Sequence, residues 1–177
     1  GKKYNNFNYF QGNIRSKLKQ LENDKAFISE PQYNKQKNGL EKLLPKYKTI
    51  DQISLVPASV FCRSIDFGGK FDGRYGTEQD NTLINRFSTW LEETTALERE
   101  GLTIYDLDRY IRGDRVCGGS KEENRKIKEK RKSICDKLFN QFIQQGLTSE
   151  EQSQITDEFN KTYNSWHYPN YIDVPLY

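Results

Sequence analysis

The sequence contains no methionine, a single histidine and three cysteines, and it has no long apolar run. A membrane-spanning helix needs about 20 consecutive apolar residues, and a signal peptide needs a positively charged start followed by an apolar stretch. Neither pattern is present. Three widely spaced cysteines also exclude a disulfide framework. These absences predict a reduced protein of the cytoplasm with no membrane partner.

Apolar residues are also scarce, at 34% of the chain, against about 45–50% in ordinary globular domains when glycine is counted. Aromatic residues reach 13%, and each can bury about 150–250 Å². We therefore expect a folded protein with a thin core, and the length of 177 residues predicts one domain over 1–177.

The sequence starts at Gly1 and has no methionine to start translation. We therefore interpret it as a fragment of a larger protein, with an N-terminal arm over 1–12.

A helical hairpin is predicted over 13–45. Asn13 is a good N-cap, and apolar residues then recur at helical spacing to about residue 23. Ser29 and Pro31 predict the start of a second helix, and Pro45 ends it. Because the connector is short, the two helices should be antiparallel.

Four further helices follow from apolar periodicity and capping signals. Thr103 with Asp106, and Thr148 with Glu151, have the spacing of capping boxes. Arg131 occupies a position in the apolar stripe of one long helix, so we expect the first half of that helix to project into solvent. The predicted ranges are 82–91, 103–112, 121–145 and 148–166. The sum is a mainly α fold of about six helices.

Three segments lack a helical pattern. Residues 54–65 read as a loop or short strand, interrupted by Pro57. Residues 66–80 hold four glycines and predict a Gly-rich loop or a small hairpin. Residues 167–177 predict an extended aromatic tail, which we expect to dock on the helical body or on a further domain.

No catalytic or metal site is predicted. A general base needs a positioned partner, and His167 has none in its sequence neighbourhood. The cysteines lack the CxxC or CxxH spacing of zinc ligands, although Cys117 lies near arginines, where a reactive thiol is conceivable. The paired carboxylates are interpreted as helix caps and as residues on solvent-exposed helix faces. We expect no enzyme activity, no cofactor and no metal. The alternative hypothesis is a small enzyme with a pocket near His167 or Cys117.

Charge is distributed unevenly. Residues 121–132 carry seven basic and three acidic side chains, a local net charge of +4, and residues 147–160 carry a net charge of −4. The two segments could pair and neutralise each other, or the basic one could contact nucleic-acid phosphates. The basic candidates are Lys121, Arg125, Lys126, Lys128, Lys130, Arg131 and Lys132. In the second case the partner is DNA, contacted at its phosphates without dependence on base sequence.

The Gly-rich segment adds two candidates, Lys70 and Arg74. Its glycines have neither the P-loop nor the dinucleotide-binding spacing. One reading is an exposed turn. The other is a loop that touches a nucleic-acid strand, because Lys70, Arg74, Phe71 and Tyr75 are the residue types that bind phosphates and stack on bases.

Both ends of the chain resemble a known family. The N-terminal segments that carry the resemblance are Tyr9-Phe10-Gln11-Gly12-Asn13-Ile14, Lys17-Leu18-Lys19-Gln20-Leu21-Glu22, Tyr33-Asn34-Lys35-Gln36-Lys37 and Leu43-Leu44-Pro45. The C-terminal segments are Leu138-Phe139-Asn140-Gln141-Phe142, Gly146-Leu147, Phe159-Asn160-Lys161-Thr162-Tyr163-Asn164, Pro169-Asn170-Tyr171 and Val174-Pro175. They are similar to the region between the methylase and helicase parts of very large phage and mobile-element proteins, just before the Swi/Snf-like helicase motor. Residues 54–120 match nothing in that family.

The resemblance implies no catalytic residue, since the methylase and ATPase motifs of such proteins lie outside this region. It implies a non-catalytic accessory or connector domain of a DNA-processing protein, next to the adjacent methylase and helicase domains. The alternative is a phage-related structural or scaffold domain with protein partners only.

Overall fold

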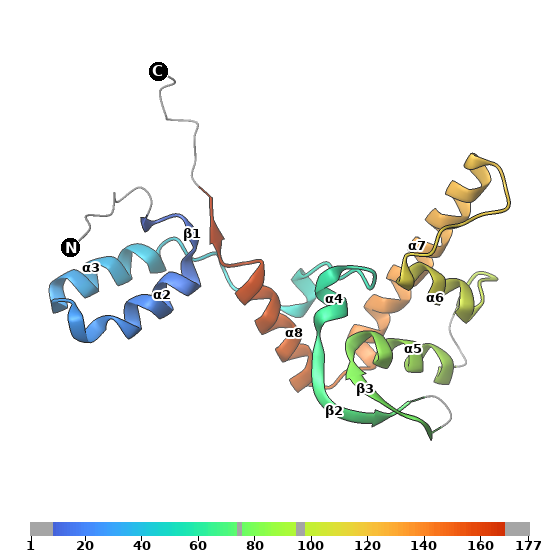
Figure 1. Cartoon of the computed structure of the whole chain (residues 1–177), viewed down its shortest axis with the longest axis horizontal. Helices are drawn as coiled ribbons and strands as arrows, with labels where there is room; N and C mark the ends of the chain where they lie inside the picture. Colours follow the sequence, from blue (N-terminus) through green and yellow to red (C-terminus); the bar gives the residue numbers. More distant parts are fainter. Residues whose placement is uncertain (1–8, 74–75, 95–97, 169–177) are drawn as a thin grey trace, which may run out of the picture. The chain divides into compact units, whose positions relative to one another are not determined.

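The chain is mainly helical and contains two short strand pairs (Figure 1). The computed structural model describes residues 9–73, 76–94 and 98–168. The α-helices of this described part are α2 (Ile14–Asn23), α3 (Glu30–Glu41), α4 (Val60–Ser64), α5 (Leu83–Glu93), α6 (Ile104–Arg112), α7 (Lys121–Gln145) and α8 (Ser149–Thr162). The 3₁₀ turns are η1 (Lys25–Phe27) and η2 (Ile50–Gln52). The mainly α prediction is confirmed.

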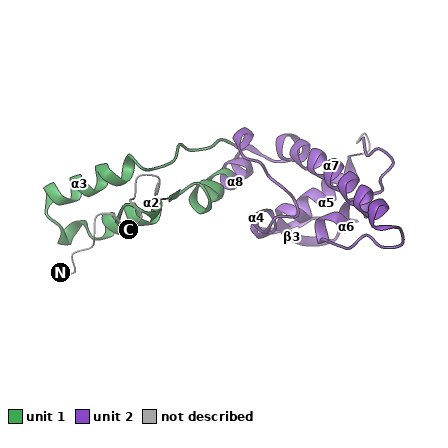
Figure 2. Ribbon diagram, turned by 90° about the horizontal axis from the view of Figure 1, so that it is seen from above, with its two compact units in different colours: residues 1–49, 156–177 green, residues 50–155 purple. Residues whose placement is uncertain are grey.

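Two antiparallel strand pairs accompany the helices. Strand β1 (Gly12–Asn13) pairs with β4 (Trp166–His167), and β2 (Asp66–Asp72) pairs with β3 (Glu78–Thr82). The chain groups into two compact units, residues 1–49 with 156–177, and residues 50–155 (Figure 2). The expectation of one domain over 1–177 stays a prediction.

The first unit contains the predicted N-terminal hairpin, formed by α2 and α3. The side chain of Asn13 accepts a hydrogen bond from the Ser16 amide at 2.9 Å, so it caps α2 as the sequence indicated. The buried core of the hairpin is Ile14, Leu21, Tyr33 and Leu40. Helix α3 ends at Glu41, four residues before Pro45, because a residue before proline is disfavoured in helical geometry.

A buried amide joins the middle of the first unit. Asn160 is 1% exposed and donates to the carbonyls of Lys48 and Thr156, both at 2.8 Å. Its Oδ1 accepts from the Lys48 amide at 2.9 Å. The amide of Ile14 donates to the Ser165 carbonyl at 2.7 Å. Helix α8 thereby holds the segment after α3, and the residues that follow α8 hold the start of α2.

The second unit has an aromatic core. The rings of Phe87 and Phe139 meet edge to face with centroids 4.9 Å apart, and Trp90 and Phe142 complete the cluster. A Cβ atom on Gly146 would lie 2.4 Å from the Phe142 ring. The glycine that ends α7 is therefore required by the packing of the Phe142 ring.

The predicted capping boxes are present. Thr103 and Asp106 exchange hydrogen bonds at the start of α6, and Thr148 and Glu151 do so at the start of α8. Helix α7 has a capping box too, formed by Ser120 and Glu123, where the sequence had indicated only a break in the chain. Each box satisfies amide donors that the first helical turn leaves unpaired.

Two irregular segments are more ordered than expected. Residues 54–65, predicted as a loop or short strand, contain α4, which the Ser59 side chain caps by accepting from the Cys62 amide. Residues 66–80 form a hairpin, the second of the two forms considered. Gly68 and Gly69 have φ of +78° and +69°, which permits the irregular register between Asp66 and Lys70.

The predicted aromatic tail lies mostly outside the described residues. Its first residue, His167, belongs to β4, which pairs with β1. Trp166 is 46% exposed and Tyr168 is 76% exposed. What the rest of the tail contacts stays a prediction.

Candidate functional site

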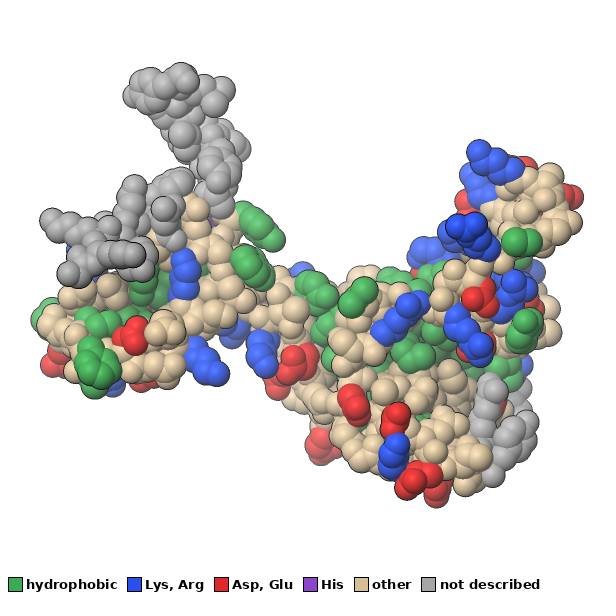
Figure 3. Space-filling view, in the orientation of Figure 1, with side chains coloured by type: hydrophobic (Ala, Val, Ile, Leu, Met, Phe, Trp, Pro, Cys, Tyr) green, Lys and Arg blue, Asp and Glu red, His purple; other side chains and the backbone are tan. Residues whose placement is uncertain are grey.

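The most strongly charged surface is the N-terminal half of α7. Every residue from Lys121 to Lys130 is exposed except Asn124, which is half-buried. Figure 1 shows this half extending beyond α5 and α6, and Figure 3 shows Lys and Arg side chains along it. The expectation that the first half of this helix projects into solvent is confirmed.

Three cations of the 121–132 segment have acidic partners. Arg125 bridges Glu122 and Glu129, at 2.9 and 3.6 Å. Lys132 pairs with Asp136 at 2.5 Å, and Arg131 pairs with Asp106 at 2.6 Å. No ion-pair partner exists within the described residues for the remaining four, Lys121, Lys126, Lys128 and Lys130. These four side chains are available to an anionic partner.

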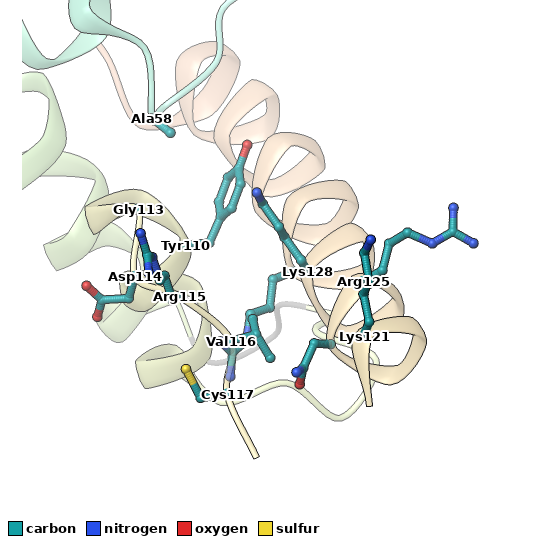
Figure 4. Close-up of a pocket in the computed structure, with 12 residues that line it drawn as sticks. Ala58, Tyr110, Gly113, Asp114, Arg115, Val116, Cys117, Lys121, Arg125 and Lys128 are labelled. Atoms are coloured by element: carbon teal, nitrogen blue, oxygen red, sulfur yellow. The ribbon is translucent and has the colours of Figure 1, made fainter. Parts of the chain in front are cut away.

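A cleft of about 650 Å³ lies between this half of α7, the end of α6 and the loop 113–117 (Figure 4). That volume falls in the range of about 300–1,000 Å³ that is usual for small-ligand sites. The side chain of Tyr110 stands between α6 and α7, and Lys128 extends beside it (Figure 4). The full lining is Ala58, Tyr110, Gly113, Asp114, Arg115, Val116, Cys117, Lys121, Asn124, Arg125, Lys128 and Arg131.

Charge is sorted between the two sides of α7. The residues of α7 that line the cleft include four of the seven predicted cations, Lys121, Arg125, Lys128 and Arg131, and none of the glutamates of the segment. The spacing of three and four residues places them on one face of the helix. The loop adds Arg115, and Asp114 is the one carboxylate of the lining. Cationic side chains therefore border the cleft, while its exposed lining is mainly apolar.

Arg131 is the most buried cation of the cleft. Its side chain is 10% exposed and its Nη2 donates to Asp106 at 2.6 Å. Its Nε is buried without a hydrogen-bond partner in the described part, as is Oδ1 of Asn124. The sequence indicated that Arg131 interrupts an apolar stripe; the structure adds that Asp106 accommodates it there.

Tyr110 is fixed in the wall of the cleft. Its hydroxyl donates to Asp136 at 3.3 Å, and Asp136 also accepts from Lys132. Burial, followed by the charge of Asp136, raises the pKa of Tyr110 well above its usual value of 10.0. The phenol therefore stays neutral, and its ring is an apolar surface among cations.

The acidic segment 147–160 does not neutralise the basic one. Glu151 pairs with Arg86 at 3.3 Å, Asp157 accepts from the Tyr47 hydroxyl at 2.5 Å, and Glu158 pairs with Lys161 at 3.4 Å. Glu150 is exposed, and no ion pair among the described residues joins it to the basic segment.

Of the hairpin candidates, the structure describes Lys70, which does not line the cleft. Lys70 pairs across the hairpin with Asp80, which raises the pKa of the lysine. The hairpin also exposes Asp66, Asp72 and Glu78, so its field disfavours a phosphate. Arg74 lies outside the described residues, and its role stays a prediction.

The nucleophile candidates are separated. Cys62 and Cys135 are buried, and Cys117 is exposed. Burial, followed by Asp136, raises the pKa of the Cys135 thiol to about 12. Cys117 lines the cleft, which contains no histidine; His167 lies in β4, opposite Gly12.

The described residues contain neither a metal-binding cluster nor a membrane-spanning helix. No group of three or more metal-binding side chains comes together there. No helix in those ranges has both the length and the apolarity to cross a membrane.

Sequence reasoning missed the wall opposite α7. Tyr110 was placed in the predicted helix 103–112 without a role in a site, and Arg115 and Val116 lie outside every predicted element. The available signal was the clustering of Arg109, Arg112 and Arg115 beside glycines. Basic residues that cluster beside glycines indicate an exposed loop. Such a loop can pack next to another basic segment and form a shared site with it.

Comparisons with protein-family models, curated proteins and solved structures found no match to this chain. The resemblance to phage methylase–helicase proteins therefore stays a prediction.

Proposed function

We propose that this chain is a non-catalytic accessory domain that contacts DNA phosphates through the cleft-facing cations of α7. The observation that carries the proposal is the sorting of charge, which leaves Lys121, Lys128 and Arg115 around one cleft with no ion-pair partner among the residues that the structure describes. With the resemblance at both ends, the parent is a large phage or mobile-element protein of the DNA methylase–helicase type. The domain connects its enzymatic parts in the cytoplasm of a bacterial host.

The dimensions of the surface suit a polyanion. Lys121 and Lys128 are seven residues apart, which is about 10 Å along a helix. Duplex DNA carries about six charges over that length, at one per about 1.7 Å. Several phosphates are thus within reach of one α7, which favours contact that does not depend on base sequence.

The first test is fluorescence anisotropy of labelled duplex and single-stranded DNA, titrated with the protein from low to physiological salt. The variant Lys121→Gln with Lys128→Gln removes two cleft cations. We expect weaker binding, and a slope of log affinity against log salt that is lower by about 2 for duplex DNA. Arg131 is left intact, because its buried ion pair contributes to stability.

The matched control is Lys126→Gln with Lys130→Gln. These lysines do not line the cleft and lie on the opposite face of the same helix, at about 100° per residue. The control should keep most of the affinity. Equal losses of affinity in both variants would show that the net charge of the helix, and not the cleft, determines binding. If no DNA binds even at low salt, the scaffold alternative with protein partners only becomes the better interpretation.

A further inference from the structure

We infer that the cleft takes a nucleotide whose base is unpaired, so that the DNA bound by this domain is single-stranded or locally opened. This inference rests on the proposed function and adds the form of the nucleic acid. It is carried by the joining of an aromatic ring and phosphate-binding cations in one cleft of about 650 Å³.

The cleft combines two kinds of surface. Tyr110, Val116 and Ala58 form an apolar wall, and Lys121, Lys128 and Arg115 supply positive charge. Phosphate groups alone need only the cations. A base has a π-face that stacks on an aromatic side chain, and sites for single strands combine such stacking with a positively charged groove.

The position of Tyr110 suits stacking. Its hydroxyl is held by Asp136, so the ring is fixed before a ligand arrives and little side-chain entropy is lost on binding. Lys128 lies beside the ring (Figure 4), within the same cleft, where it can meet the phosphate of a stacked nucleotide.

The test compares a 20-nucleotide oligothymidylate with a 20-base-pair duplex, each labelled, by anisotropy at fixed salt. Tyr110→Leu removes the π-face and keeps apolar bulk. We expect it to weaken binding of the single strand about 5- to 150-fold, the range for one lost base–aromatic stack, and to leave duplex binding within twofold. Tyr110→Phe keeps the ring and should bind the single strand within twofold of the wild-type protein.

A second variant guards against misfolding of the first. Val116→Asp places a negative charge in the cleft without touching the Tyr110–Asp136 hydrogen bond. It should also weaken single-strand binding more than duplex binding. Circular dichroism and thermal melting establish which variants are folded.

The outcomes separate this inference from the proposed function. Loss of binding in Lys121→Gln with Lys128→Gln, without loss in Tyr110→Leu or Val116→Asp, would overturn the inference and keep the phosphate contact. Thymidine monophosphate that binds as tightly as the oligonucleotide would make a free nucleotide the ligand and overturn the assignment of a strand. Vesicles of phosphatidylserine that bind equally well would overturn both.

Discussion

The two halves of α7 have opposite environments although they share one continuous helix. Residues 121–130 are solvent-exposed and charged, whereas 131–145 contribute seven buried residues, including Arg131 and Phe139, to the second unit. The exposed half is stabilised by the Ser120–Glu123 capping box and by the Arg125 ion pairs. The buried half is stabilised by tertiary packing.

The comparison shows that one half of the helix contributes most of the stability, while the other half carries the exposed charges. Exposed ion pairs contribute about 0.2–1 kcal/mol each, while a buried aromatic contributes several times more. The outer half is thus free to vary in sequence for binding, provided that its capping and helix propensity are kept. Arg131 and Asp106 lie at the boundary between the two regimes.

The largest effect is expected in the buried half. Phe139 is fully buried and contacts Phe87 and Phe142. Phe139→Ala should lower the free energy of unfolding by about 3–5 kcal/mol. The control Lys130→Ala, nine residues away on the same helix, should change it by less than about 0.5 kcal/mol. Urea denaturation followed by circular dichroism measures both, and similar losses in the two variants would contradict the comparison.

The next largest loss of stability is expected at Arg131 and Asp106, where the exposed half of α7 meets the buried half. Asp106→Ala removes the partner of a side chain that is 10% exposed, and should cost about 2–4 kcal/mol because it leaves a buried charge unpaired. Adding Arg131→Met removes that charge and should restore most of the loss, apart from the capping contribution of Asp106. If the double variant is no more stable than Asp106→Ala, the buried charge is not the cause.

The smallest effect is a pH dependence at the same boundary. Hydrogen bonds from the Thr103 hydroxyl and amide, and then Arg131, hold the pKa of Asp106 below its usual 3.8. The contribution is therefore complete above about pH 4 and is lost as the pH falls through the folded-state pKa. Since the carboxylate is one-quarter exposed, we expect less than about 1 kcal/mol.

The measurement is urea denaturation at pH 7 and pH 3. The wild-type protein should lose more stability than Asp106→Asn, which cannot titrate at this position. An equal loss in the two proteins would assign the acid sensitivity to other carboxylates.

Helices and their caps were largely predictable because their signals are local. Asn13, the Thr103–Asp106 pair and the Thr148–Glu151 pair each satisfy amides within their own helix turn, so spacing alone is informative. Helix α4 was missed because its five residues are too few to show a period. The hairpin 66–80 was left open beside a loop because glycine permits both conformations.

The candidate site was predictable only on one side. The cations of α7 are visible as a charge run, but the cleft also depends on how the end of α6 and the loop 113–117 pack against that helix. The burial of Arg131 likewise depends on Asp106, 25 residues earlier in the sequence. Such pairings are tertiary and leave no periodic signal.

The hydrogen bonds of Asn160 to Lys48 and of Ile14 to Ser165 have a consequence for synthesis on the ribosome. The first compact unit is made of residues from both sides of the second, so the α2–α3 hairpin is translated long before the helix that completes its unit. At about 5–20 residues per second, that interval is on the order of ten seconds. During it, residues 50–155 emerge in full, and the second unit can fold while the first still lacks its final helix.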